Sequence, residues 1–384
     1  MGLRVGMVTP RYPPGRGGVE EVVANQARVL AERGHRVEVL THTNDRAATG
    51  TVREGGVTVT RYRGVTGSER YPVAPGLYPA LRRAAGRFDV VHAHHYHDAA
   101  AMAVLGLPAS VPVVFTPHLH GGGHTVAARL MHLFYGPLGR RLFDRADRVA
   151  CVSEAEADLV ASMFPTAAVR TTVVRNGLRL RSRPPGPYDG RSAPLLLSFG
   201  RLEHYKRQDL AIRALAHLPG WELAIVGDGP AGPELRDLAS RTGVADRVHF
   251  PGRVSDDDLG RWMARAWAFV SMSEKEAFGL TLLEAAAWGI PVVASAIPAH
   301  REVSGLVPGE VQLVTSGTDP QSLAGSVARA AKPMTKVEPR SWVESLSWAS
   351  AGQSLEAVYR TLAEAATTPI NDLDTRPPLI APRT

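Results

Sequence analysis

The sequence predicts an α/β protein built from two doubly wound domains that face a central cleft. Short β-branched runs alternate with amphipathic helical segments along most of the chain, and one stretch rich in Pro, Gly and Arg interrupts the alternation. At 384 residues the chain is long enough for two domains of ordinary size. Its composition, with 44% hydrophobic and 21% charged residues, is that of a globular protein, which excludes wholesale disorder.

The first half of the chain begins with a strand, a helix and a second strand. In the helix Val19, Val22, Val23, Gln26 and Leu30 share one face, and compact apolar runs farther on are typical of buried parallel strands. Residues 181–192 form the expected linker, so the first domain spans 1–180. The expected strands are 4–9, 36–41, 89–94, 112–118, 147–153 and 172–176, and the expected helix is 19–33.

A second alternating series predicts the second domain at 193–350, followed by a helix at 351–366 and a disordered Pro-rich tail at 367–384. Ligands of doubly wound sheets bind outside the carboxyl ends of the strands. Two capping patterns, Ser153 with Glu156 and Ser255 with Asp258, predict helix starts. The expected strands are 195–199, 221–227, 248–251, 267–273, 291–295 and 311–314, and the expected helices are 208–218, 234–241, 256–266 and 278–288.

One segment of the second domain combines two glutamates with a helix start. Glu276 precedes a helix that we expect to begin near Phe278 or Gly279, and Glu284 lies eight residues beyond Glu276. The first amides of a helix lack intrahelical partners and form a site for a diphosphate. The expected donors are the amides of Phe278, Gly279, Leu280 and Thr281. The alternative is a buried amphipathic helix that carries an incidental glutamate pair.

The phrase EAFGLTLLEAAAWGIPVVA, residues 276–294, resembles the Glu-x7-Glu hallmark of the large family of retaining glycosyltransferases with the GT-B fold, glycosyltransferase family 4, group 1. Ala277 stands where that family usually has Gly. The resemblance implies that Glu276 contacts the donor sugar and that Glu284 holds the ribose hydroxyls of the donor nucleotide. It also implies a last helix that crosses back to the first domain.

A second phrase agrees with the first. SFGRLEHYKRQDLAIRAL, residues 198–215, resembles the family's strand and Arg-x4-Lys loop, which implies that Arg201 and Lys206 bracket the donor diphosphate. Solvated surface charges are the alternative. Arg207 replaces the family's usual Gly and could add a cation or face solvent, and Arg179 replaces an acidic residue near the interdomain hinge.

Other phrases add donor contacts by the same resemblance. In the first domain a G-G-x-E turn follows the first strand, and in the family its amides face the donor phosphates and the acceptor. A nicotinamide-binding fingerprint would need glycine at position 20, where the chain has Glu20, so that motif fails. The added donor-binding residues are Gly17 and Gly18 in this turn, Gly227 beside the donor, and Arg253 and Val254 at the nucleobase.

Histidines are the main polar candidates in the first domain. His118 follows a strand in a T-x-H setting that in the family lies near the donor sugar and its leaving phosphate. His92 and His94 share a strand face and could form a metal pair, but no third ligand is identifiable and the family needs no metal. We therefore expect no metal and a packed His92. The candidate acceptor contacts are Tyr12, His94, His95 and His120.

The resemblance implies a metal-independent enzyme without a cofactor, which moves a hexosyl or N-acetylhexosaminyl group from a nucleotide-sugar to the hydroxyl of a lipid, glycan or small-molecule acceptor. Retention by double displacement needs a carboxylate nucleophile. The first domain offers no convincing one, and the resemblance implies front-face substitution, with His118, Arg201, Lys206 and Glu276 as catalytic residues. A nucleotide-sugar epimerase or pseudo-glycosyltransferase is the alternative on this fold. The sequence names neither the nucleobase (uracil, guanine or thymine) nor the acceptor.

Charge divides unevenly along the chain. Residues 1–190 carry 24 basic and 15 acidic residues, a net +9, whereas residues 191–384 carry 20 and 22, a net −2. An anionic acceptor would fit the first half, and residues 129–148 form either a membrane-surface helix or a core-packed one. No nucleic-acid module accompanies the basic charge, so we expect no nucleic-acid partner. A single cysteine in an apolar run, Cys151, and the lack of an export signal predict a cytoplasmic protein.

Overall fold

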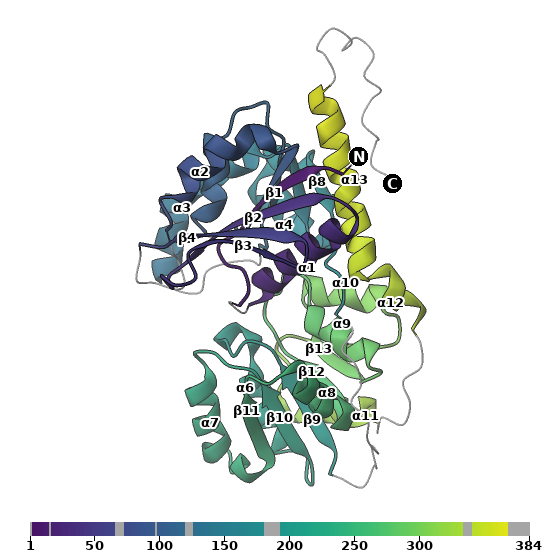
Figure 1. Cartoon of the computed structure of the whole chain (residues 1–384). Helices are drawn as coiled ribbons and strands as arrows, with labels where there is room; N and C mark the ends of the chain where they lie inside the picture. The colour runs from purple at the N-terminus through teal and green to yellow at the C-terminus, as the bar shows by residue number, and fades with distance from the viewer. Residues whose placement is uncertain are drawn as a thin grey trace.

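The computed structural model describes residues 2–14, 17–65, 73–96, 98–119, 126–179, 193–332 and 340–367, with only the backbone for 126–135. Within these residues two β-sheets, each flanked by helices, form two domains stacked one above the other (Figure 1). Among the described residues no helix combines the length and apolar character that crossing a membrane requires. The expected linker, and the expected tail after residue 367, lie outside the described residues.

The first sheet has eight strands in the order β3-β4-β2-β1-β5-β6-β7-β8. The strand order reverses at β1, which pairs in parallel with both β2 and β5. Strands β3 and β4 form an antiparallel hairpin, and the other neighbouring pairs are parallel. The bounds are β1 (Arg4–Val8), β2 (Arg36–Thr43), β3 (Gly50–Glu54), β4 (Val57–Arg63), β5 (Val90–His94), β6 (Val113–Thr116), β7 (Arg148–Cys151) and β8 (Thr171–Val173).

The hairpin of β3 and β4 differs from the sequence prediction, which placed no strand between residues 41 and 89. Strand β4 alternates buried and part-exposed residues, the period-two pattern of a strand with one covered face. Every residue of β3 is exposed, so its sequence carries no burial pattern. A polar, exposed edge strand of this kind is visible only through its pairing with β4.

The second sheet has six parallel strands in the order β11-β10-β9-β12-β13-β14. Here the order reverses at β9, which pairs with both β10 and β12. The predicted strand ranges agree with these strands to within two residues at either end. The bounds are β9 (Leu195–Phe199), β10 (Glu222–Val226), β11 (Val248–Gly252), β12 (Ala266–Ser271), β13 (Val292–Ser295) and β14 (Val311–Val314).

Helices connect most of the consecutive strands and cover both sheets (Figure 1). The predicted N-caps Ser153 and Ser255 accept hydrogen bonds from the amides of Glu156 and Asp258, at 2.9 Å and 3.1 Å. The α-helices are α1 (Gly18–Glu32), α2 (Leu77–Ala84), α3 (Val126–Arg145), α4 (Glu154–Met163), α5 (Pro165–Ala168), α6 (Gln208–Leu215), α7 (Gly232–Arg241), α8 (Asp256–Arg265), α9 (Leu280–Ala287), α10 (Pro298–Leu306), α11 (Pro320–Ala330), α12 (Ser341–Ser345) and α13 (Trp348–Thr367). Short 3-10 helices are η1 (Ala85–Arg87), η2 (Ala100–Gly106), η3 (His204–Lys206) and η4 (Ala245–Arg247).

The last helix, α13, leaves the second domain and runs along the first (yellow in Figure 1). It begins at Trp348, three residues before the expected position, because the Ser347 hydroxyl accepts the Ser350 amide at 3.2 Å and starts the helix there. Its Glu356 accepts a 2.6 Å hydrogen bond from Arg33, which follows α1, and its Tyr359 is fully buried. Helix α13 is therefore part of the first domain's core.

Gly352 permits the close packing of α13 on α1. A Cβ atom at this position would lie 2.4 Å from Cγ1 of Val29, whose β-branched side chain is stiff in a helix. Gly352→Ala should therefore destabilise the protein by about 1–2 kcal/mol, because overpacking exceeds the gain in helix propensity. Urea unfolding would measure the difference.

The matched control is Gly305→Ala. Gly305 lies in α10, and nothing occupies the space within 4 Å of its added Cβ. This variant should be neutral or gain up to about 1 kcal/mol. Equal stabilities of the two variants would contradict the proposed close contact.

Candidate active site

The two reversals of strand order place many of the predicted site residues at the switch point of their own sheet. In a doubly wound sheet, ligands bind at this switch point, outside the carboxyl ends of the central strands. In the first sheet the loop after β1 carries Tyr12, Gly17 and Gly18, and the end of β5 carries His94 and His95. In the second sheet the loop after β9 carries Arg201 and Lys206, and the loop after β12 carries Glu276.

Lys206 and Glu276 form an ion pair at the second switch point. The Lys206 Nζ donates to Glu276 Oε1 at 2.5 Å, although the two residues are 70 positions apart. Their side chains are only 18% and 14% exposed. Such a pair is mostly removed from water, so each charge depends on its partner.

The pair holds both groups in their charged forms. Burial disfavours the Lys206 ammonium, but the charge and hydrogen bond of Glu276 outweigh burial and raise the pKa of Lys206. For Glu276, burial is again the largest single effect and opposes the charge. It is outweighed by Lys206, with help from His300 and Ser273, so the pKa of Glu276 is lowered.

Further contacts clamp the same two loops. The Glu274 amide donates to the Tyr205 carbonyl at 2.8 Å, and Arg207 donates to the Glu274 carboxylate at 2.9 Å. Arg207 also pairs with Asp209 at 3.0 Å, so its guanidinium bonds to two carboxylates and does not simply face solvent. Arg201 lies on the same loop, is 49% exposed and lies 3.8 Å from Glu203.

A polar layer behind Glu276 was not predicted from the sequence. The Ser273 hydroxyl donates to Glu276 Oε1 at 2.8 Å, and the Ser295 hydroxyl donates to the Ser273 carbonyl at 2.5 Å. His300, fully buried, donates from Nδ1 to the Ser295 carbonyl at 2.9 Å. Only Ser273 had a usable sequence signal, a small polar residue at a strand end three residues before Glu276.

Helix α9 begins at Leu280, one or two residues later than expected. Gly279 is its N-cap and has a φ of 101°, a left-handed conformation that favours glycine. The amides that open the helix are therefore those of Leu280 and Thr281, whereas Phe278 is buried in the core of the second domain. Glu284 lies on the same helix, one turn from Leu280.

Gly227, a predicted donor contact, lies where the strand ends of the second sheet approach each other closely. Its φ is 143°, and a Cβ here would lie 1.8 Å from the Gly200 carbonyl oxygen. Its amide donates to the Gly252 carbonyl at 2.9 Å. Arg253 is exposed, and Val254 packs against the apolar core and lines a pocket with Trp262.

In the first domain the predicted histidines form a buried row. Nδ1 of His94 lies 3.4 Å from Nε2 of His118, and the rings of His92 and His94 are 3.9 Å apart. His92 is packed as expected, between Thr116 at 2.8 Å and Tyr359 of α13 at 2.6 Å. Burial lowers the pKa of His92 to about 3 and that of His94 far below its usual range, so both are neutral.

The candidate acceptor residues lie in different surroundings. His94 is fully buried, and His118 is 8% exposed. His95 adopts a left-handed φ of 76°, and Tyr12 is half-buried with its pKa raised to about 12, mainly by burial. His120 lies outside the described residues.

The G-G-x-E turn begins α1, with Gly17 as the N-cap and Gly18 as the first helical residue. Its acidic member, Glu20, is 3% exposed and lies 2.8 Å from the Arg11 guanidinium. A Cβ at Gly17 would lie 2.3 Å from the Glu20 carboxylate. Glycine at this position therefore leaves room for the buried carboxylate, a role that the sequence did not reveal.

Contacts also join the two domains beside the site. The Ser153 hydroxyl of α4 donates to the Ala277 carbonyl at 2.5 Å. Glu302 of α10 accepts from the Ala155 amide and from Arg175, both at 3.1 Å. Arg179, which departs from the family pattern, bridges Glu21 of α1 and Asp256 of α8.

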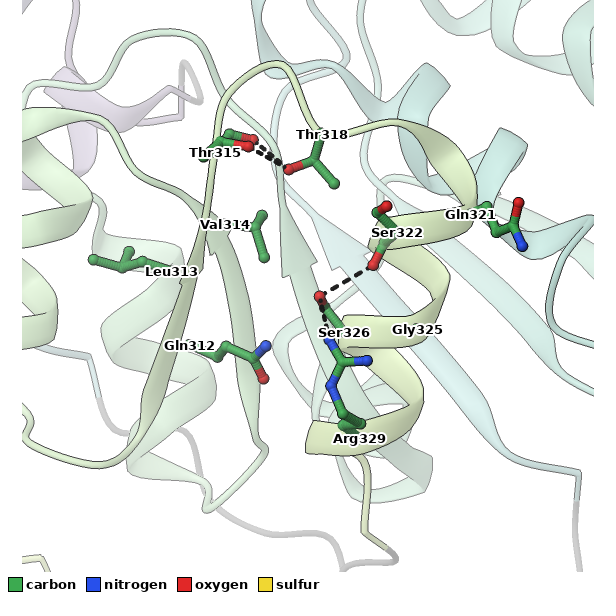
Figure 2. Close-up of a pocket in the computed structure, with 10 residues that line it drawn as sticks. All are labelled: Gln312, Leu313, Val314, Thr315, Thr318, Gln321, Ser322, Gly325, Ser326 and Arg329. Carbon is green, nitrogen blue, oxygen red and sulfur yellow. Dashed lines mark hydrogen bonds between the residues drawn. The ribbon is translucent and has the colours of Figure 1, made fainter.

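A pocket of about 480 Å³ lies in the second domain between β14 and α11 (Figure 2). It is at the sheet edge, because β14 is the outermost strand, and it is separate from the switch point of β9 and β12. Its hydroxyls bond locally: Thr315 and Thr318 are 2.9 Å apart, and Ser326 donates to the Ser322 carbonyl at 3.1 Å. None of its lining residues is among the predicted site residues.

Metal-ligating side chains are scattered over the part of the chain that the structure describes. No group of three or more His, Cys, Asp or Glu side chains there is arranged to hold a metal ion. Cys151 is fully buried, and burial raises the pKa of its thiol above the usual range.

Solved structures share the whole architecture. Sucrose-phosphate synthase of Thermosynechococcus elongatus superposes with a TM-score of 0.76 at 21% identity, over 94% of this chain and 100% of that one. Anabaena HepE, solved with UDP and glucose, gives a TM-score of 0.68 at 19% identity over 94% of this chain and 100% of that one. Two parallel-sheet domains arranged in this way define the GT-B fold of glycosyltransferases.

Sequence comparison places the chain within that class. Residues 16–181 match the model of Glycosyltransferase Family 4, and residues 190–336 match that of Glycosyl transferases group 1. A D-inositol 3-phosphate glycosyltransferase of Acidothermus cellulolyticus is 32% identical over 94% of this chain and 89% of its own. A GDP-mannose:cellobiosyl-diphosphopolyprenol alpha-mannosyltransferase of Xanthomonas campestris is 32% identical over 77% of this chain and 79% of its own. The chain belongs to the glycosyltransferases of family 4, group 1.

Removing one member of the buried ion pair should destabilise the second domain. Glu276→Gln leaves the Lys206 ammonium without a countercharge, at a cost of about 3 kcal/mol near pH 7. Because the folded-state pKa of Glu276 is lowered, its stabilisation is present above the unfolded pKa of about 4.3 and is lost as the pH falls through the folded pKa. The difference from wild type should therefore shrink below about pH 4.

Urea unfolding at neutral and acidic pH would measure this difference. Glu274→Gln is the control, since its carboxylate is 43% exposed and its pair with Arg207 contributes less than about 1 kcal/mol. Equal losses for both variants at pH 7 would refute the special role of the buried pair.

Proposed function

We propose that this glycosyltransferase moves a sugar from a nucleotide-sugar, bound by the second domain (193–350), to an acceptor hydroxyl bound by the first domain (1–180). The transfer retains the anomeric configuration and uses neither a metal ion nor a cofactor. The observation that carries the proposal is the Lys206–Glu276 pair, which lies at a switch point just before the start of α9. This arrangement combines a cation, a carboxylate and helix amides within one site.

In the proposed mechanism the second domain stabilises the leaving diphosphate. Lys206, Arg201 and the first amides of α9 offset the negative charge that develops there, as preorganised donors do in other transfer enzymes. Glu276 accepts hydrogen bonds from sugar hydroxyls, and Glu284 holds the ribose. Gly227, Arg253 and Val254 are the proposed neighbours of the nucleotide.

The first domain supplies the remaining contacts in the proposed mechanism. His118 contacts the donor sugar beside its leaving phosphate, and the phosphate itself takes the proton of the attacking hydroxyl. Water is excluded when the two domains close on both substrates. The net +9 charge of residues 1–190 favours an anionic acceptor. Membrane contact through residues 129–148 stays a prediction, since side chains of 126–135 lie outside the described residues.

Donor binding can be tested without knowing the acceptor. Anabaena HepE has been solved with UDP-glucose, so a uridine donor is the first choice within a panel of UDP-, GDP- and dTDP-sugars. A ligand that binds only the folded state at 100 times its Kd should stabilise by about 2.7 kcal/mol, which thermal shift detects. A panel without any shift would contradict the proposal. A donor converted to another sugar without acceptor would indicate an epimerase instead.

Arg201 offers a catalytic test that spares the fold, because its side chain is 49% exposed. Arg201→Met should lower the release of nucleotide from the bound donor roughly 100-fold, as removal of a charge-stabilising donor does elsewhere. The control is Arg241→Met, an arginine of α7 that is 65% exposed. Equal turnover by the two variants would remove Arg201 from the mechanism.

A further inference from the structure

A buried carboxylate in the first domain anchors the residue that follows His118. Glu156 of α4 is 2% exposed, and its two oxygens accept the backbone amides of Leu119 and Val152, the latter at 2.7 Å. In an ordinary capping box this glutamate would return to the amide of the N-cap, Ser153. Here it reaches across to the loop after β6 instead.

The anchored loop holds His118 in a strained conformation. His118 has a φ of 50°, in the left-handed region that residues other than glycine rarely adopt. Such strain persists only where the surroundings fix the backbone, and it concentrates at functional positions. The Glu156–Leu119 hydrogen bond fixes the backbone one residue after His118, and the His94 ring lies beside its imidazole.

The same helix start contacts the donor loop of the other domain. The Ser153 hydroxyl accepts the Glu156 amide at 2.9 Å and donates to the Ala277 carbonyl at 2.5 Å. Ala277 directly follows Glu276. Three successive hydrogen bonds therefore link Leu119, which follows His118, with Ala277.

We propose that Glu156 is a positioning residue that sets the His118 imidazole relative to the donor loop, with Ser153 as the interdomain contact. The proposal rests on the proposed function in one respect, the role of His118 beside the donor sugar. Glu156 itself touches no substrate, since it is buried behind the loop.

The substitution that isolates this role is Glu156→Gln. Burial raises the pKa of Glu156 to about 8, and in either protonation state both oxygens can face the two amides. Glutamine is nearly isosteric but has one oxygen, so its NH2 group would face an amide N–H and one bond would be lost. Glu156→Asp is a second variant, because it keeps the carboxyl group but its shorter side chain cannot span both amides.

The first measurement needs no substrate. The imidazole resonance of His118 would be followed in histidine-labelled protein and assigned by its absence from His118→Ala. It should shift in Glu156→Gln and Glu156→Asp, and stay unchanged in Glu154→Gln. Glu154 is the matched control, because it lies on the same helix turn with its side chain 62% exposed.

The second measurement is a double-mutant comparison of UDP release from UDP-glucose by hydrolysis, in which water takes the glucosyl group. Glu156→Gln should lower kcat roughly 100-fold in the wild-type background, as a misplacement of about 1 Å does, and leave the Kd for UDP unchanged. In the His118→Ala background it should have no further effect. Ser153→Ala should give a smaller loss of kcat.

An equal fall of kcat in both backgrounds, or an unshifted His118 resonance, would overturn the positioning role and leave a merely structural glutamate. Wild-type protein that releases no UDP would count against the proposed function with this donor. In that case the shift of the His118 resonance would be the only test of the positioning role.

Discussion

The ion pair of Lys206 and Glu276 organises the second domain's half of the site. The two residues are adjacent because β9 and β12 are neighbours in the sheet, although 70 residues separate them in the chain. Burying both charges carries a desolvation cost that only close pairing and extra hydrogen bonds offset. Ser273 supplies such a bond to Glu276. Arg207 and the Tyr205 carbonyl both bond to Glu274, so they join the loops after β9 and β12 beside the pair.

The sequence was sufficient for the fold class, with its two doubly wound domains. The alternating runs predicted both parallel sheets. They also predicted that the loops of Lys206 and Glu276 directly follow strands, at the edge of the sheet where ligands bind. The sequence analysis did not predict the β3–β4 hairpin, because every residue of β3 is exposed. It also placed Glu156 in an ordinary capping box, because a local pattern cannot show that a carboxylate reaches Leu119, 37 residues away.

Long-range polar contacts account for the rest of what the sequence could not reveal. Tyr359 of α13 lies 267 residues from His92, and no periodicity in either segment points to the other. The contact exists because α13 crosses from the second domain into the core of the first. Through His92 and His94, whose tilted rings have centroids 3.9 Å apart, helix α13 supports the row of rings that ends at His118.

The contacts between the domains differ in kind, and the difference bears on domain movement. Arg179 and its two partners are each nearly half exposed, so these pairs are weak and screened by salt. Glu302 is only 11% exposed and gathers Arg175 and the Ala155 amide, and Ser153 meets Ala277 nearby. A few directional bonds at one place, with weak pairs elsewhere, form a pivot more than a rigid joint. The pivot lies beside Glu276 and the loop of His118, so closure about it would change the space between the domains while these two loops stay in register.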